Sequence, residues 1–161
     1  MTHNKIFQGR IGRRQLARSL CVQALYQWHM AGHSASEVEA QFLADQDFQK
    51  ADKRLFSQLL RGVTSRVEAL DKLLIPHLDR TIGELDPVEI SILRMGVFEL
   101  SDSINTPYRV IINECIELGK QFGATDGYKY INSIMDQLAH QLRTIEMQSR
   151  RPAPDKRTGR T

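Results

Sequence analysis

The fold is decided by residues 86–100, which read DPVEISILRMGVFEL. Asp86 and Pro87 form the usual start of a helix, a capping carboxylate before a proline at the first helical position, and Glu89 completes a capping box. The apolar residues that follow cover nearly every side of this helix: Val88, Ile92, Leu93, Met95, Val97 and Leu100. Because a helix that is apolar all round is normally buried, we expect this segment at the centre of an all-α protein.

Amphipathic helices are expected on the N-terminal side of this segment. Leu16, Leu20, Ala24 and Trp28 recur at four-residue spacing, which predicts a helix over about residues 13–31. Three more helices are predicted after it, one capped by Ser34 or Ser36, one over about 51–63, and one over 67–74 that ends before Pro76.

Two further helices are expected on the C-terminal side. Thr106 and Pro107 repeat the capping arrangement and predict a helix that ends at Gly123. Asp126 can cap the last helix, whose apolar repeat includes Ile145. No apolar residues alternate as they do in a strand. We therefore predict an all-α fold of about seven helices, in a compact bundle of two packed helical halves divided near residues 80–86.

Length and composition indicate one globular domain. The chain is 41% hydrophobic, enough for a core, and no apolar run approaches the roughly 18 to 20 residues that span a bilayer. The N-terminus lacks an apolar secretory signal, so we expect a cytoplasmic protein that does not contact a membrane. We divide the chain into a flexible basic arm (1–12), a helical domain (13–147) and a disordered basic tail (148–161).

Positive charge is concentrated at the two ends of the chain. Residues 1–18 carry +5 and residues 149–161 carry +4, which leaves −6 on residues 19–148 for a net charge of +3. Basic ends are a common means of binding a polyanion, because neutralised phosphates release counterions. The alternative is that the ends are merely solvated, and Pro152, Pro154 and Gly159 favour it for the tail.

No set of residues indicates catalysis or a metal centre. The sequence has no glycine-rich phosphate loop. His29 and His33 have the spacing of metal ligands on a helix, but no further ligand lies near them in the sequence. Cys21 and Cys115 lie among apolar helical residues and are expected to be packed, reduced thiols. We therefore expect neither enzymatic activity nor a cofactor.

Two groups of residues suit single-stranded RNA. Arg14 and Arg18 share one stripe of the first helix, where guanidinium groups can bind phosphates or stack on bases. A second group, at the start of the last helix, combines charge, a stacking ring and an amide that could read a base edge. It comprises Asp126, Lys129, Tyr130 and Asn132. An ordinary cap followed by a core tyrosine is the alternative there.

Four short segments form a larger pattern over about residues 13–143. They are Arg18 with CVQALY (21–26) and Trp28; VE (88–89) with ILR (92–94) and FEL (98–100); PY (107–108) with INE (112–114) and KQFG (120–123); and Asp126 with KYIN (129–132) and Asp136. Together they resemble the NusB family of bacterial transcription antitermination factors. Tyr130 replaces the more usual phenylalanine and keeps an aromatic face. Two departures stand out: Gly127 occupies a position where serine is common, and Gln15 and Leu16 interrupt the family's arginine run.

The resemblance implies both partners and site residues. It implies binding to the boxA element of nascent ribosomal RNA together with NusE, a small-subunit ribosomal protein. The pair would act within the RNA polymerase antitermination complex with other Nus factors. The resemblance places an RNA-binding arm at Arg13, Arg14 and Arg18. It also places five residues at RNA contacts or at the adjoining NusE surface: Tyr26, Glu89, Arg94, Asp126 and Tyr130.

Two other classes of protein remain as alternatives. One is a helical protein-interaction scaffold, or a homodimer, with incidental RNA affinity; the sequence does not distinguish a monomer from a homodimer. The other is the NusB-like domain found at the front of some RNA methyltransferases. We disfavour it because the chain ends soon after the helical unit, which leaves no room for a catalytic domain.

Overall fold

A computed structural model describes residues 12–149, and this part of the chain is helical without a strand. The α-helices are α2 (Arg13–Ala31), α3 (Ala35–Leu43), α4 (Lys53–Ser65), α5 (Val67–Leu74), α6 (Pro87–Asp102), α7 (Tyr108–Phe122), α8 (Gly127–Leu142) and α9 (Thr144–Ser149). Short 3-10 segments are η1 (Gln46–Lys50), η2 (Ile75–His77) and η3 (Ile82–Glu84). The all-α prediction is confirmed. Almost all of the predicted basic arm and basic tail lies outside the described residues.

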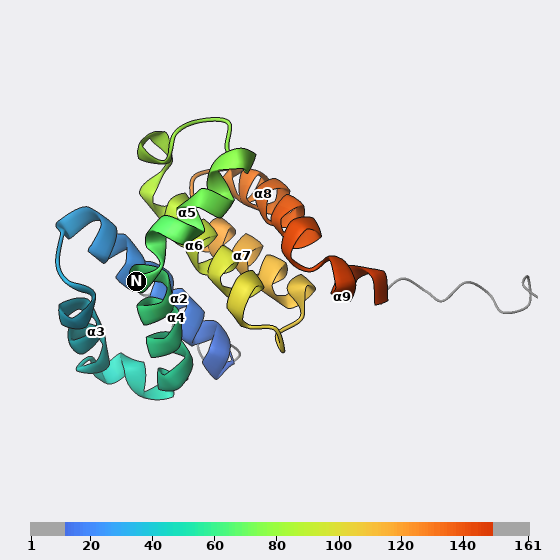
Figure 1. The fold of residues 1–161 in the computed structure, drawn as a ribbon. Coiled ribbons are helices and arrows are strands. Elements are labelled where there is room, and N and C mark those ends of the chain that lie inside the picture. The colour runs from blue at the N-terminus through green and yellow to red at the C-terminus, as the bar shows by residue number, and fades with distance from the viewer. Residues whose placement is uncertain (1–11, 150–161) are drawn as a thin grey trace, which may run out of the picture.

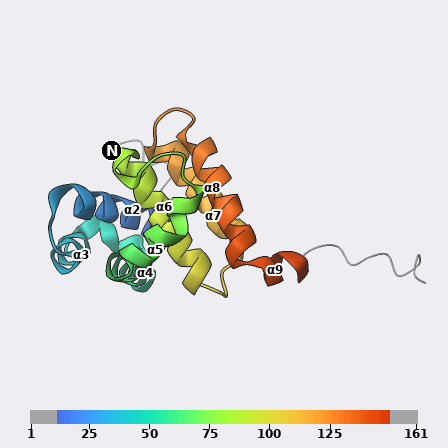
Figure 2. The same cartoon turned by 45° about the horizontal axis from the view of Figure 1, so that its top comes forward.

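Helix α6 is the central element, as residues 86–100 predict. Every residue from Glu89 to Leu100 is buried. The helix packs on α2, α4 and α5 on one side and on α7 and α8 on the other (Figures 1 and 2). The two groups of helices meet along α6. Residues 78–86 form the connection that leads from the first group into α6.

Several helix ends form by the predicted local chemistry. Gly32 ends α2 in the left-handed region, with φ of 70°, a conformation that suits glycine. The Ser34 hydroxyl accepts a hydrogen bond from the Glu37 amide at 3.2 Å. Asp86 accepts from the Val88 amide at 2.8 Å and from the Glu89 amide at 3.3 Å, so the start of α6 is fixed by its own side chain.

Two predicted caps and one predicted helix end are wrong. Thr106 does not cap α7, which begins at Tyr108 after an N-cap at Pro107. Asp126 adopts φ of 66° and its side chain makes no capping bond to α8. The last predicted helix divides at Arg143, and Ile145 belongs to the separate helix α9 with 84% of its surface exposed.

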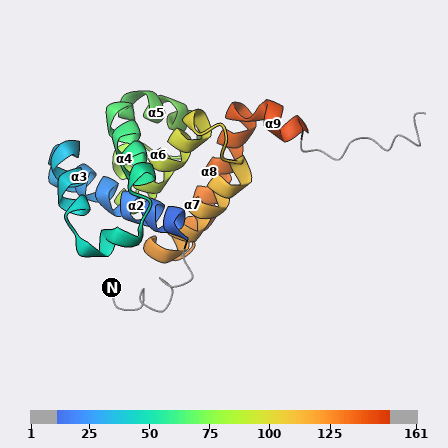
Figure 3. The ribbon, with the colours of Figure 1, turned by 90° about the horizontal axis from the view of Figure 1, so that it is seen from below.

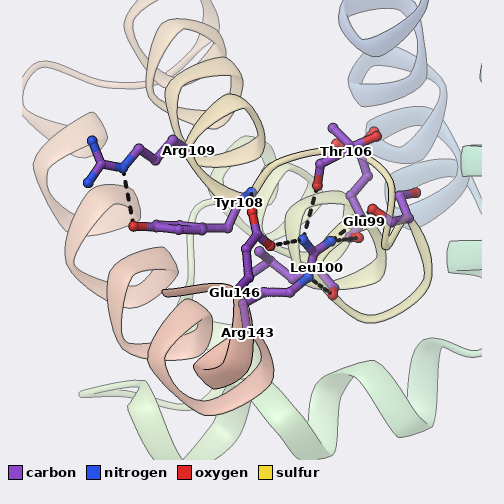
Figure 4. Close-up of polar contacts among 8 residues, drawn as sticks. Glu99, Leu100, Thr106, Tyr108, Arg109, Arg143 and Glu146 are labelled. Atoms are coloured by element: carbon purple, nitrogen blue, oxygen red, sulfur yellow. Dashed lines mark hydrogen bonds and ion pairs between the residues drawn. The ribbon is translucent and has the colours of Figure 1, made fainter. Parts of the chain in front are cut away.

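The cause of the division at Arg143 is an interaction with distant residues (Figure 4). The buried Arg143 guanidinium donates to four carbonyl oxygens at the end of α6 and in the following turn, at 2.7 to 3.2 Å: those of Glu99, Leu100, Ser103 and Thr106. It also pairs with Glu146, whose carboxylate accepts from the Tyr108 amide at 3.1 Å. One arginine therefore satisfies the end of α6, and its glutamate partner caps α7.

Candidate nucleic-acid interface

The start of α2 presents an exposed pair of arginines. Arg13 and Arg14 occupy its first two positions, and 71% of the Arg14 side chain is exposed. The Arg14 Nε atom lies 3.9 Å from an oxygen of Asp52, too far for a strong hydrogen bond. Both guanidinium groups are thus available to an anionic partner.

Arg18, one turn further along α2, lies in a different environment. Only 5% of its side chain is exposed, and its Nε atom donates to both carboxylate oxygens of Glu99 at 3.0 and 3.1 Å. Burial raises the pKa of Glu99, and the charge and hydrogen bond of Arg18 oppose that rise. In this structure Arg18 joins α2 to α6 and offers little surface to RNA, although the sequence placed it with Arg14.

Arg94 is also held inside the protein. Its Nε and Nη2 atoms each donate to one oxygen of Asp71 at 2.9 Å, which is a bidentate pair between α6 and α5. Its Nη1 atom lies 3.2 Å from Nδ1 of His29 on α2. Burial, together with the charge of Arg94, lowers the pKa of His29. Arg94 thus connects three helices.

A polar surface forms at the start of α8, where Tyr130 meets the loop after η2. The Tyr130 hydroxyl donates to Asp79 at 2.8 Å and accepts from the Asp79 amide at 3.3 Å. Arg80 lies over the Tyr130 ring at 5.1 Å and pairs with Asp79 at 2.8 Å. Hydrogen bonds from Arg80 and Tyr130 lower the pKa of Asp79 to about 2. The ring and guanidinium form a platform of the kind that stacks on bases.

The other residues predicted at this helix start lie around the platform. Asp126 and Lys129 are exposed and pair with each other at 3.3 Å, and Asn132 is exposed on the next turn. Glu89 lies buried beneath them, and burial raises its pKa. A Cβ atom on Gly127 would lie 2.4 Å from the Glu89 carboxylate, so glycine permits this close approach of α8 to α6.

Tyr26 lines an apolar groove on the same side of the molecule as the start of α6. The groove has a volume of about 500 Å³ and is formed by Val22, Gln23, Tyr26, Gln27, Met30, Ala31, Phe42, Val88 and Phe122. Tyr26 and Met30 are exposed. Val88 precedes Glu89, so the structure brings Tyr26 towards the α8 platform, whereas about 18 Å of helix separates it from Arg14.

Asp79 and Arg80 are the polar partners that sequence reasoning missed. They lie 51 and 50 residues before Tyr130 and outside any helix, so neither periodicity nor capping patterns could connect them to it. The adjacent opposite charges after Pro76 were the one available signal.

Other chemistry finds no support in the described part of the chain. Residues 12–149 contain no group of three or more His, Cys, Asp or Glu side chains that could hold a metal ion. Cys21 and Cys115 are buried, as predicted, and burial raises the pKa of both thiols. None of the helices described is long and apolar enough to cross a membrane.

The fold and these surfaces define the class of protein: an all-helical binding protein with exposed cations and an aromatic platform on a buried polar framework. A model of the NusB family matches residues 15–140. The chain therefore belongs to the NusB family, whose members are transcription antitermination factors rather than enzymes.

Relatives and solved structures agree with this assignment. The transcription antitermination protein NusB of Hahella chejuensis is 54% identical over 84% of this chain and 91% of its own. The solved NusB of T. maritima has a TM-score of 0.74 at 24% identity, over 84% of this chain and 96% of that one. A solved complex of the antitermination factors NusB and NusE with double-stranded RNA gives 0.65 at 21% identity, over 79% and 96%. These structures support the fold.

Proposed function

We propose that this protein binds the boxA element of nascent ribosomal RNA together with NusE and acts in the cytoplasm on the elongating RNA polymerase with other Nus factors. The observation that carries the proposal is that the protein presents two surfaces of different chemistry, one of exposed arginines and one with an aromatic ring. Arg13 and Arg14 suit phosphates, and the Tyr130–Arg80 platform suits an unstacked base. Membership of the NusB family and the likeness to the solved complex of NusB, NusE and double-stranded RNA support the same function.

The apolar groove beside Tyr26 is the surface that we assign to the protein partner. It is lined mostly by apolar side chains and reaches the start of α6 at Val88, the residue before Glu89. Such a groove suits a protein better than it suits a phosphate backbone. RNA and NusE would then occupy neighbouring surfaces, and each would bind more tightly in the presence of the other.

A gel-shift titration tests the proposal. Labelled boxA RNA and a scrambled RNA are titrated with this protein, with NusE, and with both. We expect boxA to bind more tightly to the pair than to either protein, and more tightly than the scrambled RNA does. The plot of log affinity against log salt has a negative slope. The variant R13Q/R14Q should make this slope less steep by about 1.4, the value for two phosphate contacts on a single strand.

The same gel-shift assay includes a control variant and has a result that would contradict the proposal. The variant K72Q/R109Q removes two exposed cations from α5 and α7 and should bind RNA as the wild type does. RNA binding that is weak, indifferent to sequence and unaffected by NusE would favour the alternative, an interaction scaffold or homodimer with incidental RNA affinity.

A further inference from the structure

A second group of exposed cations lies next to the start of α2. Lys50 ends η1, and Lys53 and Arg54 open α4; all three are exposed. The aromatic residues nearest to them in the sequence, Phe48 and Phe56, are buried in the core. This part of the surface therefore offers charge without a stacking ring, which is a means of contacting a nucleic-acid backbone rather than its bases.

The structure holds this group against Arg13 and Arg14. The Asp52 amide donates to the Arg13 carbonyl oxygen at 3.0 Å, and the Asp52 carboxylate lies 3.9 Å from Arg14. Helix α4 lies alongside α2 (Figures 1 and 3). We name the set Arg13, Arg14, Lys50, Lys53 and Arg54 the α2–α4 basic surface.

The cations at the starts of α2 and α4 have no acidic neighbour within the first turn of their own helix. Asp52, the N-cap residue of α4, lies between the two helices: one of its carboxylate oxygens is 3.9 Å from Arg14, and the other accepts from the Leu55 amide at 3.0 Å. Exposed arginines elsewhere have close partners: Arg61 pairs with Glu39 at 2.8 Å and Arg80 with Asp79 at 2.8 Å.

We propose that the α2–α4 basic surface binds RNA phosphates, so that the path of the RNA continues from the start of α2 onto η1 and α4. The proposal rests on the proposed function and extends it to Lys50, Lys53 and Arg54, which no sequence motif indicated. Because these contacts are to phosphates, they add affinity for RNA of any sequence and leave the choice of boxA to other residues.

A matched pair of double variants tests the surface. K53Q/R54Q removes one lysine and one arginine from α4, and K72Q/R109Q removes one of each from α5 and α7; glutamine keeps a good helix propensity. In the presence of NusE, we expect K53Q/R54Q to bind both boxA and scrambled RNA about fivefold more weakly and to lower the salt slope by about 1.4. The control variant should match the wild type in both RNA affinity and salt slope.

Each contrary result has a distinct meaning. If the wild type binds boxA and K53Q/R54Q binds it equally well, the α2–α4 basic surface is overturned while the proposed function stands. A loss confined to boxA, with scrambled RNA unaffected, would also overturn it, because phosphate contacts do not distinguish sequences. If the wild type with NusE binds no RNA, the proposed function itself fails. Equal urea midpoints for the two variants show that both are folded.

Discussion

Two regions of the protein use arginine in opposite ways. At the start of α2, Arg13 and Arg14 extend into solvent, and one turn later Arg18 is almost fully buried against Glu99. A spacing of four residues places Arg14 and Arg18 on the same face of the helix. The difference arises because α6 covers that face at Arg18 and leaves it open at Arg14. A guanidinium thus becomes a potential phosphate ligand or an internal partner according to what packs over it.

The interior arginines, which are Arg18, Arg94 and Arg143, all act on α6. Arg18 joins it to α2, Arg94 joins it to α5, and Arg143 satisfies the carbonyl groups at its C-terminal end. A helix that is apolar on most sides has little means of fixing its rotation, and directional hydrogen bonds supply it. The surface arginines contribute nothing comparable to the fold, so the two sets should separate in stability measurements.

The largest expected effect comes from Arg18. In Arg18→Gln the Glu99 carboxylate stays buried without its ionic partner, which should lower the free energy of unfolding by about 3 to 5 kcal/mol. Arg14→Gln, one turn away, should change it by less than about 0.5 kcal/mol. Urea unfolding followed by circular dichroism measures both. Similar losses for the two variants would remove the distinction between interior and surface arginines.

A second substitution confirms the cause of the loss at Arg18. In R18Q/E99Q the buried charge is absent, so we expect the double variant to recover part of the stability that Arg18→Gln loses. A double variant no more stable than Arg18→Gln would show that lost packing, rather than the unpaired carboxylate, causes the loss.

A smaller effect is expected from Arg143. Arg143→Met removes the hydrogen bonds to the end of α6 and should cost about 2 to 3 kcal/mol, because some of the released carbonyl groups regain water in the turn. Glu146→Gln weakens the cap on Tyr108 and should cost about 1 kcal/mol. Hydrogen exchange at the Tyr108 amide should accelerate in both variants. Unchanged exchange would mean that α9 does not hold the start of α7.

The parts of the fold that follow local rules could be predicted from the sequence. The burial of α6, the glycine end of α2 and the caps at Ser34 and Asp86 each depend on residues within one or two turns. The break at Arg143 could not be predicted, because it depends on carbonyl groups about 40 residues away. The apolar repeat continued to Ile145, and periodicity alone favoured one helix.

The candidate site also contains residues whose exposure could be predicted from the sequence and residues whose burial could not. Residue type and spacing selected Arg14 and Tyr130, which the structure leaves exposed or half-buried. The same reasoning selected Arg18, and the resemblance selected Arg94, both of which the structure buries in ion pairs. Spacing identifies a helix face but not what covers it. The partners that decide the matter, Glu99 and Asp71, lie 81 and 23 residues away in the sequence.

The smallest effect is expected from Glu89, a buried acid that can be compared with Glu99. Glu89 and Glu99 are both buried on α6, but Glu89 has no arginine in a hydrogen bond with it in the described structure, and burial with the nearby charge of Asp86 raises its pKa. Because the folded state then holds this proton more tightly than the unfolded state, the contribution of Glu89 to stability falls as pH rises through the folded pKa.

The side chain in the variant Glu89→Gln stays neutral at every pH. We therefore expect the variant to equal the wild type near about pH 4 and to exceed it by less than about 1 kcal/mol near about pH 7, as measured by urea unfolding. A difference that shrank or reversed as pH rose would mean that the fold stabilises the carboxylate form of Glu89.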